Sequence, residues 1–149
     1  MDKVAIIIPA YNEEKRIMAT LKEYSTFFNN IVKNKILDYN IIVVINNTTD
    51  GTDEIVKGFA KKNKKISYID LLRGGKGYAV IEGFKIALKR DFDYIGFVDA
   101  DMATPPEELL KVIKEARNTD GAIADRYLKD SEIHPTPSVK RLIARRGYK

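Results

Sequence analysis

Two aspartates separated by one residue, Asp99 and Asp101, are the first candidates for chemistry. They follow the apolar run Tyr94–Val98, which is typical of a buried strand. Neighbouring carboxylates repel each other, and a hard divalent ion such as Mg²⁺ or Mn²⁺ relieves that repulsion while it binds substrate phosphates. Two solvated loop acids are the alternative interpretation, because this spacing alone is only a weak indication of a metal site.

A glycine-rich loop, Gly74-Gly75-Lys76-Gly77, precedes a predicted helix. Glycines let a backbone approach a phosphate closely, and the amino end of the following helix attracts anions. The spacing of the ATP-binding P-loop is not met, because the Ser or Thr that should follow its lysine is absent. A phosphate-binding loop and a plain flexible turn therefore both remain open.

A third segment, Pro9-Ala10-Tyr11-Asn12-Glu13-Glu14, combines an aromatic ring with acids. The ring of Tyr11 could stack on a nucleobase, and a carboxylate could accept hydrogen bonds from a base or a ribose. A helix capped by Asn12, with the acids complementing the helix dipole, explains the same residues equally well. Arg126 is a further candidate for contact with a phosphate or a carboxylate.

Strand-like and helix-like segments alternate along the chain. We predict five strands, with Pro9 ending the first, at Val4–Ile8, Ile41–Ile45, Ile66–Leu72, Tyr94–Val98 and Gly121–Asp125. This alternation predicts an α/β fold with a largely parallel sheet. Ligand sites in such sheets lie at the carboxyl ends of the strands, which is where the motifs above converge.

Four helices are predicted between the strands from their apolar spacing. We expect the inner face of the first to carry Ile17, Leu21, Tyr24 and Phe28. The second, capped by Thr52, should bury Ile55, Val56, Phe59 and Ala60. The third should bury Val80, Phe84, Ala87 and Leu88, and the fourth Leu109, Leu110, Ile113 and Ala116, after a capping box that begins at Thr104.

Composition narrows the classes of protein. The chain has 149 residues, which suits a single domain over 1–149, and it has no cysteine, which excludes disulfides and thiolate chemistry. No apolar run approaches the roughly 20 residues of a membrane-spanning helix, and we expect no signal peptide. The net charge of +5 makes a basic nucleic-acid-binding protein one alternative, but no known nucleic-acid-binding pattern appears.

Together the motifs resemble the family 2 glycosyltransferases with the GT-A fold. The segment Val4–Glu14 is similar to the opening of that family, and Asp50–Thr52, Gly75–Gly77 and Val98–Asp101 follow in the family's order. The details resemble most the dolichyl- and polyprenyl-phosphate mannose and glucose synthases, including Ala124–Tyr127. The resemblance implies a three-layer, Rossmann-like nucleotide-diphospho-sugar transferase fold, mostly parallel, with helices on both faces of the sheet.

The resemblance also implies an activity, namely inverting transfer of a hexose from a nucleotide-sugar such as GDP-mannose or UDP-glucose to a polyprenyl or dolichyl phosphate. Asp99 and Asp101 would hold Mg²⁺ or Mn²⁺ against the diphosphate. The nucleotide-sugar pocket would include Pro9, Ala10, Tyr11, Glu13, Asn46, Asp50, Lys76, Asp99, Ala100, Asp101 and Arg126. No residue is assigned as catalytic base.

Two departures from the family pattern stand out. The loop from Ile45 to Asp50 lacks the usual glycine, and its leading acid is replaced by Ile45 or Asn46, so Asp50 is the better candidate for the base contact. Family members also continue beyond the point that matches Lys149. We therefore expect a truncated chain, and a donor-binding module without turnover is the main alternative to an active enzyme.

Partners and location follow from the same resemblance. We expect a cytoplasmic protein that touches the cytoplasmic face of a membrane through the basic stretch from Lys140 to Lys149, and that binds no nucleic acid. Apolar surface left uncovered by an absent acceptor-side half would favour a homodimer.

Overall fold

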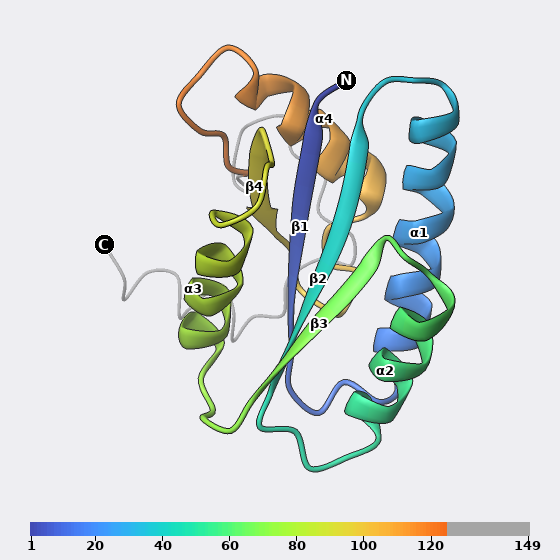
Figure 1. Cartoon of the computed structure of the whole chain (residues 1–149), viewed down its shortest axis with the longest axis vertical. Helices are drawn as coiled ribbons and strands as arrows, with labels where there is room; N and C mark the ends of the chain where they lie inside the picture. Colours follow the sequence, from blue (N-terminus) through green and yellow to red (C-terminus); the bar gives the residue numbers. More distant parts are fainter. Residues whose placement is uncertain (125–149) are drawn as a thin grey trace, which may run out of the picture.

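The computed structural model describes residues 1–124, and the structural statements below concern that part of the chain. It forms a four-stranded, fully parallel sheet in the order β3-β2-β1-β4 (Figure 1). The strands are β1 (Lys3–Ala10), β2 (Asp38–Asn46), β3 (Ile66–Leu71) and β4 (Tyr94–Phe97). The predicted parallel α/β architecture is confirmed.

Four helices connect or follow these strands: α1 (Ile17–Lys33), α2 (Thr52–Lys62), α3 (Lys76–Ala87) and α4 (Pro106–Ala116). Helices α1, α2 and α4 share a hydrophobic cluster with one face of the sheet, whereas α3 packs on the other face. Figure 1 shows α3 standing apart from α1 and α2, with the strands between them. The helices therefore sandwich the sheet in three layers, as predicted.

The two central strands are buried on both faces, which explains their uninterrupted apolar sequences. In β1, Ile6 and Ile8 pack toward α1, whereas Ala5 and Ile7, which alternate with them along the strand, pack toward α3. Side chains of a strand alternate between the two faces, so each cluster receives every second residue.

Helix α3 lies unusually close to the sheet. A Cβ atom on Gly83 would come within 2.5 Å of Ile7 Cγ2 and 3.1 Å of Val44 Cγ2. The buried face of the helix consists of Ala79, Gly83 and Ala87. The predicted face was only half right, because Leu88 is 72% exposed. Small residues occupy the buried face because only small side chains allow the helix to approach the sheet this closely.

Two strand predictions were wrong. Pro9 does not end β1 but pairs with Val44 inside it. The backbone hydrogen-bonding groups of Ile7 face β4, and those of Pro9, two residues later, face the same side. The pairing with β4 ends at Ile7–Phe97, before it reaches Pro9. The missing N–H of Pro9 therefore costs no ladder hydrogen bond. The segment 121–124 of the predicted fifth strand forms no strand, and Asp125 lies outside the described residues.

The helix caps also differ from the predictions. Helix α4 begins after Pro105 without a side-chain cap, and α1 begins at Ile17, too far along for Asn12 to cap it. Thr52 is the first residue of α2 and not its cap. Asn12, Thr52 and the carbonyl of Thr104 instead form hydrogen bonds between loops and helices, which are described below.

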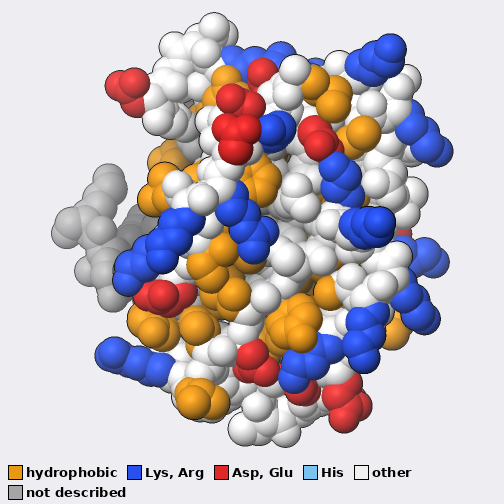
Figure 2. All heavy atoms as spheres, viewed as in Figure 1, with side chains coloured by type: hydrophobic (Ala, Val, Ile, Leu, Met, Phe, Trp, Pro, Cys, Tyr) orange, Lys and Arg blue, Asp and Glu red, His pale blue; other side chains and the backbone are white. Residues whose placement is uncertain are grey.

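Two lysines, one within α2 and one between α2 and β3, form ion pairs with acids. Lys57 Nζ lies 2.8 Å from Asp53 and 3.3 Å from Asp70, and Lys65 pairs with Asp38. Figure 2 shows basic side chains spread across this face with hydrophobic and acidic side chains between them. Within residues 1–124, no helix combines the length and the hydrophobicity that a membrane span requires.

Candidate functional site

The predicted functional loops meet at the carboxyl ends of β1, β2 and β4. They surround a cavity of about 260 Å³. Its lining consists of Pro9, Ala10, Tyr11, Glu13, Asn46, Lys76, Asp99, Ala100 and Asp101. Each of these nine residues was a candidate from the sequence. Of the other two candidates, Asp50 is absent from the lining, and Arg126 lies outside the described residues.

The acidic loop after β4 presents its two carboxylates differently. Oδ1 of Asp101 accepts a hydrogen bond of 3.0 Å from the backbone N–H of Ala103, while the residue itself is exposed. Oδ1 of Asp99 lies 2.6 Å from Nζ of Lys76, which makes an ion pair between the loop and the start of α3. Met102 completes the turn in a left-handed conformation, with φ of 60°.

Helix α1 fixes this acidic loop from the side. The hydroxyl of Thr20 donates a 2.7 Å hydrogen bond to the carbonyl of Ala100, and the hydroxyl of Tyr24 donates one of 2.6 Å to the carbonyl of Thr104. Burial, with a smaller contribution from Glu107, raises the pKa of Tyr24, so its hydroxyl remains a proton donor. The apolar spacing placed Tyr24 in the core, but it gave no indication of these contacts with a loop some 80 residues away.

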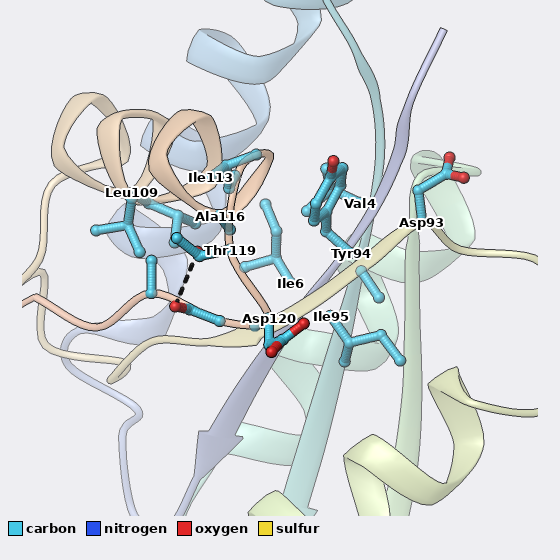
Figure 3. Close-up of a pocket in the computed structure, with 15 residues that line it drawn as sticks. Val4, Ile6, Asp93, Tyr94, Ile95, Leu109, Ile113, Ala116, Thr119 and Asp120 are labelled. Carbon is cyan, nitrogen blue, oxygen red and sulfur yellow. Dashed lines mark hydrogen bonds between the residues drawn. The ribbon is translucent and has the colours of Figure 1, made fainter.

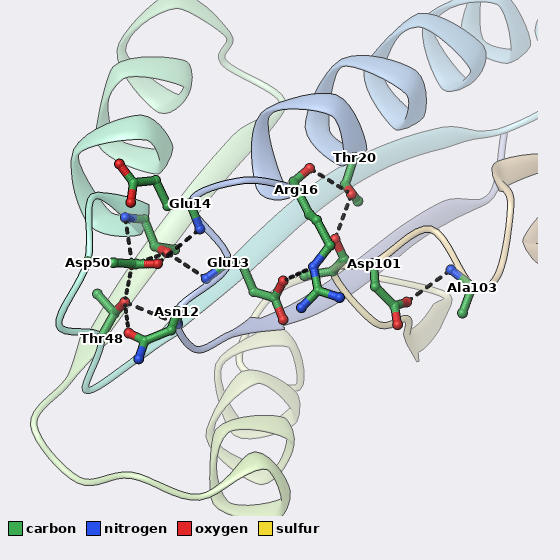
Figure 4. Close-up of polar contacts among 11 residues, drawn as sticks. Asn12, Glu13, Glu14, Arg16, Thr20, Thr48, Asp50, Asp101 and Ala103 are labelled. Carbon is green, nitrogen blue, oxygen red and sulfur yellow. Dashed lines mark hydrogen bonds and ion pairs between the residues drawn. The ribbon is translucent and has the colours of Figure 1, made fainter. Parts of the chain in front are cut away.

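Asp50 joins the loop after β1 to the loop after β2. One of its oxygens accepts hydrogen bonds from the hydroxyls of Thr48 and Thr52 and from the backbone N–H of Thr52, and the other accepts one from the N–H of Glu14 (Figure 4). Partial burial opposes ionisation of this carboxyl, but these hydrogen bonds outweigh it and lower its pKa to about 2. Both carboxylate oxygens of Asp50 are therefore occupied by hydrogen bonds within the protein.

Asn12 reinforces the same junction. Its Oδ1 accepts a hydrogen bond of 2.8 Å from the N–H of Thr49 and lies 3.0 Å from the hydroxyl oxygen of Thr48. Its backbone is left-handed, with φ of 52°, which asparagine tolerates better than most residues. Asn47 likewise adopts a left-handed backbone, with φ of 50°.

Two buried acceptors in the cavity wall lack hydrogen bonds. In the described part of the chain, Oδ1 of Asn46 and Oδ1 of Asp99 are the two buried side-chain atoms without a hydrogen-bond partner. Lys76 is near enough to Asp99 to pair with it, but its approach lacks the angle of a hydrogen bond. A buried acceptor without a partner is costly, so Asn46 Oδ1 favours an external donor in this cavity, whereas Asp99 Oδ1 already lies beside the cation of Lys76.

A larger cavity of about 310 Å³ lies elsewhere, between β1, β4 and α4 (Figure 3). Its walls are mostly apolar, including Val4, Ile6, Leu109 and Ile113, and its acids are Asp93 and Asp120. None of the predicted functional residues lines it. We therefore take the smaller cavity, where the polar groups converge, as the candidate functional site.

Comparison with known proteins identifies the family of this chain. Residues 5–149 match the family described as Glycosyl transferase family 2. The dolichol-phosphate mannosyltransferase of Pyrococcus furiosus is 33% identical over 144 residues, which are 96% of this chain and 38% of that protein. The dolichyl-phosphate beta-glucosyltransferase of Drosophila melanogaster is 31% identical over 98% of this chain and 47% of its own length.

Solved structures show the same fold. A mannosyltransferase from Pyrobaculum calidifontis, determined in complex with GDP-Man and Mn²⁺, superimposes with a TM-score of 0.59 at 21% identity, over 76% of this chain and 32% of that one. The fold is the α/β fold of the GT-A glycosyltransferases, which defines the class of protein. This chain belongs to glycosyl transferase family 2. It spans 38% to 57% of the length of five curated relatives.

The acidic loop fits the divalent ion that this fold implies. Asp99 and Asp101 offer carboxylate oxygens, one of them buried and facing an ammonium group that already occupies a cation's place. Within residues 1–124, no three acidic or histidine side chains gather in a group that could enclose a metal by themselves. A hard ion bound through one or two carboxylates and completed by substrate phosphates matches this donor set.

Proposed function

We propose that this chain binds a nucleoside-diphosphate sugar together with Mg²⁺ or Mn²⁺ in the cavity at the ends of β1, β2 and β4. The observation that carries the proposal is the meeting of two buried acceptors in one cavity: Asn46 Oδ1, which has no hydrogen-bond partner, and Asp99 Oδ1, which faces the ammonium of Lys76. These groups present partners for a cation, for an anion and for a polar ring edge at one place.

Each group has a role in this proposal. Asp99 and Asp101 hold the ion, which when bound stabilises the departing nucleoside diphosphate as a Lewis acid. Lys76 leaves Asp99 and contacts a phosphate oxygen, and the free N–H groups at the start of α3 face the same negative charge. The exposed ring of Tyr11 lies at the cavity's rim, where it can cover a nucleobase.

The full reaction in this proposal is transfer of a hexose to a polyprenyl phosphate with inversion at the anomeric carbon. Relatives whose names specify dolichol-phosphate or dolichyl-phosphate transfer of mannose and glucose support it. An ionised phosphate acceptor needs no strong general base, because its oxygen is already a nucleophile. Peripheral contact with the cytoplasmic face of a membrane follows from such an acceptor. Contact of Arg126 with the phosphates is also part of this proposal.

Calorimetric titration of the chain with UDP and with GDP, in Mn²⁺ and in chelator, tests the donor site. We expect binding of at least one nucleotide, and we expect chelator to abolish it. Asp101→Asn keeps an oxygen for the N–H of Ala103 but removes a charge, so it should weaken binding strongly. Asp91→Asn, the same change at an exposed residue outside the cavity, is the matched control. A nucleotide affinity that changes neither on removal of Mn²⁺ nor in the Asp101→Asn variant would refute the metal-dependent site.

A second measurement separates an enzyme from a binding module without turnover. Both bind the nucleotide-sugar with metal, but only the enzyme releases nucleoside diphosphate when a polyprenyl phosphate is added. We favour the enzyme for the intact protein and expect release of nucleoside diphosphate to depend on the acceptor. Hydrolysis that proceeds equally without acceptor would contradict transfer as the activity.

A further inference from the structure

The solvent side of α3 is unusually apolar for a surface helix. Its face toward the sheet consists of small residues, yet Ile81 is 54% exposed and Leu88, just after the helix, is 72% exposed. These two residues are separated by about two helical turns, so they share one stripe on the side away from the sheet. Leu72, in the loop that leads to the helix, is 95% exposed.

The other exposed side chains of the segment 72–90 are basic. Apart from glycines and the three aliphatic residues above, its exposed residues are Arg73, Lys76, Lys85, Lys89 and Arg90. Glu82 is the one acid in the segment, and it is partly buried and paired with Lys85. Five basic residues against one acid give the segment a net charge of +4, compared with +5 for the whole chain. Figure 2 shows hydrophobic and basic side chains side by side in the region that α3 occupies in Figure 1.

Helix α4, on the other face of the sheet, shows the pattern of an ordinary surface helix. Its exposed positions all carry charged residues, and both signs are present: Glu107, Glu108, Lys111, Lys114 and Glu115. Single apolar residues on a surface are common and need no explanation. An aliphatic stripe flanked by charges of one sign, as on α3, is typical of a helix that lies on an anionic lipid surface.

Two other occupants of this face match it less well. A second copy of the chain in a symmetric contact would bring two faces of the same charge together, and they would repel each other. A nucleic acid would attract the basic side chains but would leave Ile81 and Leu88 in a polar environment. A bilayer with anionic headgroups complements the charge and also receives the aliphatic side chains.

We propose that α3 and the loop before it dock on an anionic bilayer surface, with Leu72, Ile81 and Leu88 entering the acyl region and the basic side chains at the headgroup phosphates. Lys76 begins α3 and lines the donor cavity, so docking holds that cavity at the level of the headgroups. The phosphate of a membrane-borne polyprenyl phosphate lies at the same level. The inference rests on the proposed function for this acceptor and adds to it the surface that reaches the membrane.

Sedimentation of the full chain with lipid vesicles tests the aliphatic part of this surface. We expect binding to vesicles of phosphatidylcholine mixed with phosphatidylglycerol, and much weaker binding to vesicles of phosphatidylcholine alone. Ile81→Gln should weaken binding to the mixed vesicles about fivefold, and the further change Leu88→Gln should weaken it more, because fewer aliphatic side chains enter the acyl region. Met18→Gln is the matched control, since Met18 is 53% exposed and lies on α1, on the opposite face of the sheet.

The charge of the surface is tested with a second matched pair of variants. Lys85 on α3 and Lys111 on α4 each form an ion pair with a glutamate three residues earlier. Lys85→Glu should weaken binding to the mixed vesicles about fivefold or more, since a single charge near an anionic surface has that effect. Lys111→Glu should weaken it much less, because α4 lies on the other face.

Three results would overturn the docking of α3. The first is no binding to the mixed vesicles, and the second is binding that the changes in α3 weaken no more than their controls do. The third is a dimer, seen by sedimentation velocity without lipid, that Ile81→Gln dissociates, because a second copy would then cover this face. Mn²⁺-dependent nucleotide binding should be unchanged in these variants, since neither Ile81 nor Lys85 lines the cavity. A chain that binds vesicles through α3 but binds no nucleotide would overturn the donor site and leave the docking surface standing.

Discussion

Lys76 and Asp99 form an ion pair across the cavity, with Nζ 2.6 Å from Oδ1, although one residue begins α3 and the other lies two residues after β4. In the proposed site, a metal ion bound to Asp99 would replace the ammonium beside this oxygen. Metal binding and this ion pair would then compete for one carboxylate oxygen. The same lysine, once displaced, is free to meet the phosphates that arrive with the metal.

Replacement of Lys76 by Gln should separate these two roles. We expect Mn²⁺ alone to bind a few-fold more tightly, because the competing ammonium is gone. At saturating Mn²⁺, we expect the nucleoside diphosphate to bind more weakly, because a phosphate contact is lost. Calorimetry with Mn²⁺ alone and then with nucleotide measures both effects.

The matched control is Lys85→Gln, also on α3, where the lysine pairs with Glu82 and does not line the cavity. It should alter neither affinity. If Lys76→Gln leaves the affinity for Mn²⁺ alone unchanged, the lysine does not occupy the cation's place.

The Asp50 junction predicts a dependence of stability on pH. Its pKa is about 2 in the folded protein against an ordinary value of 3.8, so the folded state holds the proton less readily than the unfolded state. The stabilisation is complete above about pH 4 and is lost as the pH falls toward 2. Asp50→Asn should lower the free energy of unfolding by about 1–2 kcal/mol at pH 7, and the difference from the unmodified protein should vanish near pH 2.

Urea unfolding of both proteins across pH 2–7 measures this difference. Asp91→Asn serves as control, since that carboxylate is 95% exposed and meets only Lys3. A difference between the Asp50 variant and the unmodified protein that stays constant from pH 7 to pH 2 would show that ionisation of Asp50 does not carry the effect.

The close approach of α3 to the sheet predicts a strong asymmetry between two glycines. Gly83→Ala should destabilise the protein by about 1–3 kcal/mol, because the new methyl group overlaps Ile7 and Val44 in a packed core. Gly58→Ala in α2 meets nothing within 4 Å and should stabilise by up to about 1 kcal/mol through helix propensity. Thermal or urea unfolding of the two variants provides the comparison. Equal effects would mean that α3 can shift outward at no cost.

The sequence predicted the sheet and the convergence of the loops well, for a physical reason. Parallel strands place all their carboxyl ends at one edge, so motifs that follow Ile8, Ile45 and Val98 must meet there. The direction of each side chain was not predictable in the same way. Asp50 also follows a strand, yet its carboxylate points away from the cavity, because it accepts hydrogen bonds from Thr48, Thr52 and Glu14.

Long-range contacts were equally hidden. The spacing of apolar residues in α1 does not indicate the bond from Thr20 to Ala100, because a hydroxyl on a buried helix face could donate to any of several carbonyls. The buried face of α3 was misjudged for a related reason. Hydrophobicity favours Leu88, whereas the short distance between helix and sheet favours Gly83, and that distance is a property of the folded core.

The bond from Tyr24 to Thr104 predicts that α1 holds the acidic loop in its binding geometry. Tyr24→Phe keeps the ring that packs beside Phe28 but removes the donor to the Thr104 carbonyl. We expect a loss of about 1–2 kcal/mol in unfolding free energy and weaker Mn²⁺-dependent binding of nucleotide. Tyr39→Phe is the matched control, because its equally buried hydroxyl bonds to Asn29 and Ser25 and not to the acidic loop. The control should lose similar stability but retain binding, since its loss leaves Asp99 and Asp101 in place. If both variants bind nucleotide like the unmodified protein, the acidic loop keeps its geometry without α1, and Tyr24 serves only the core.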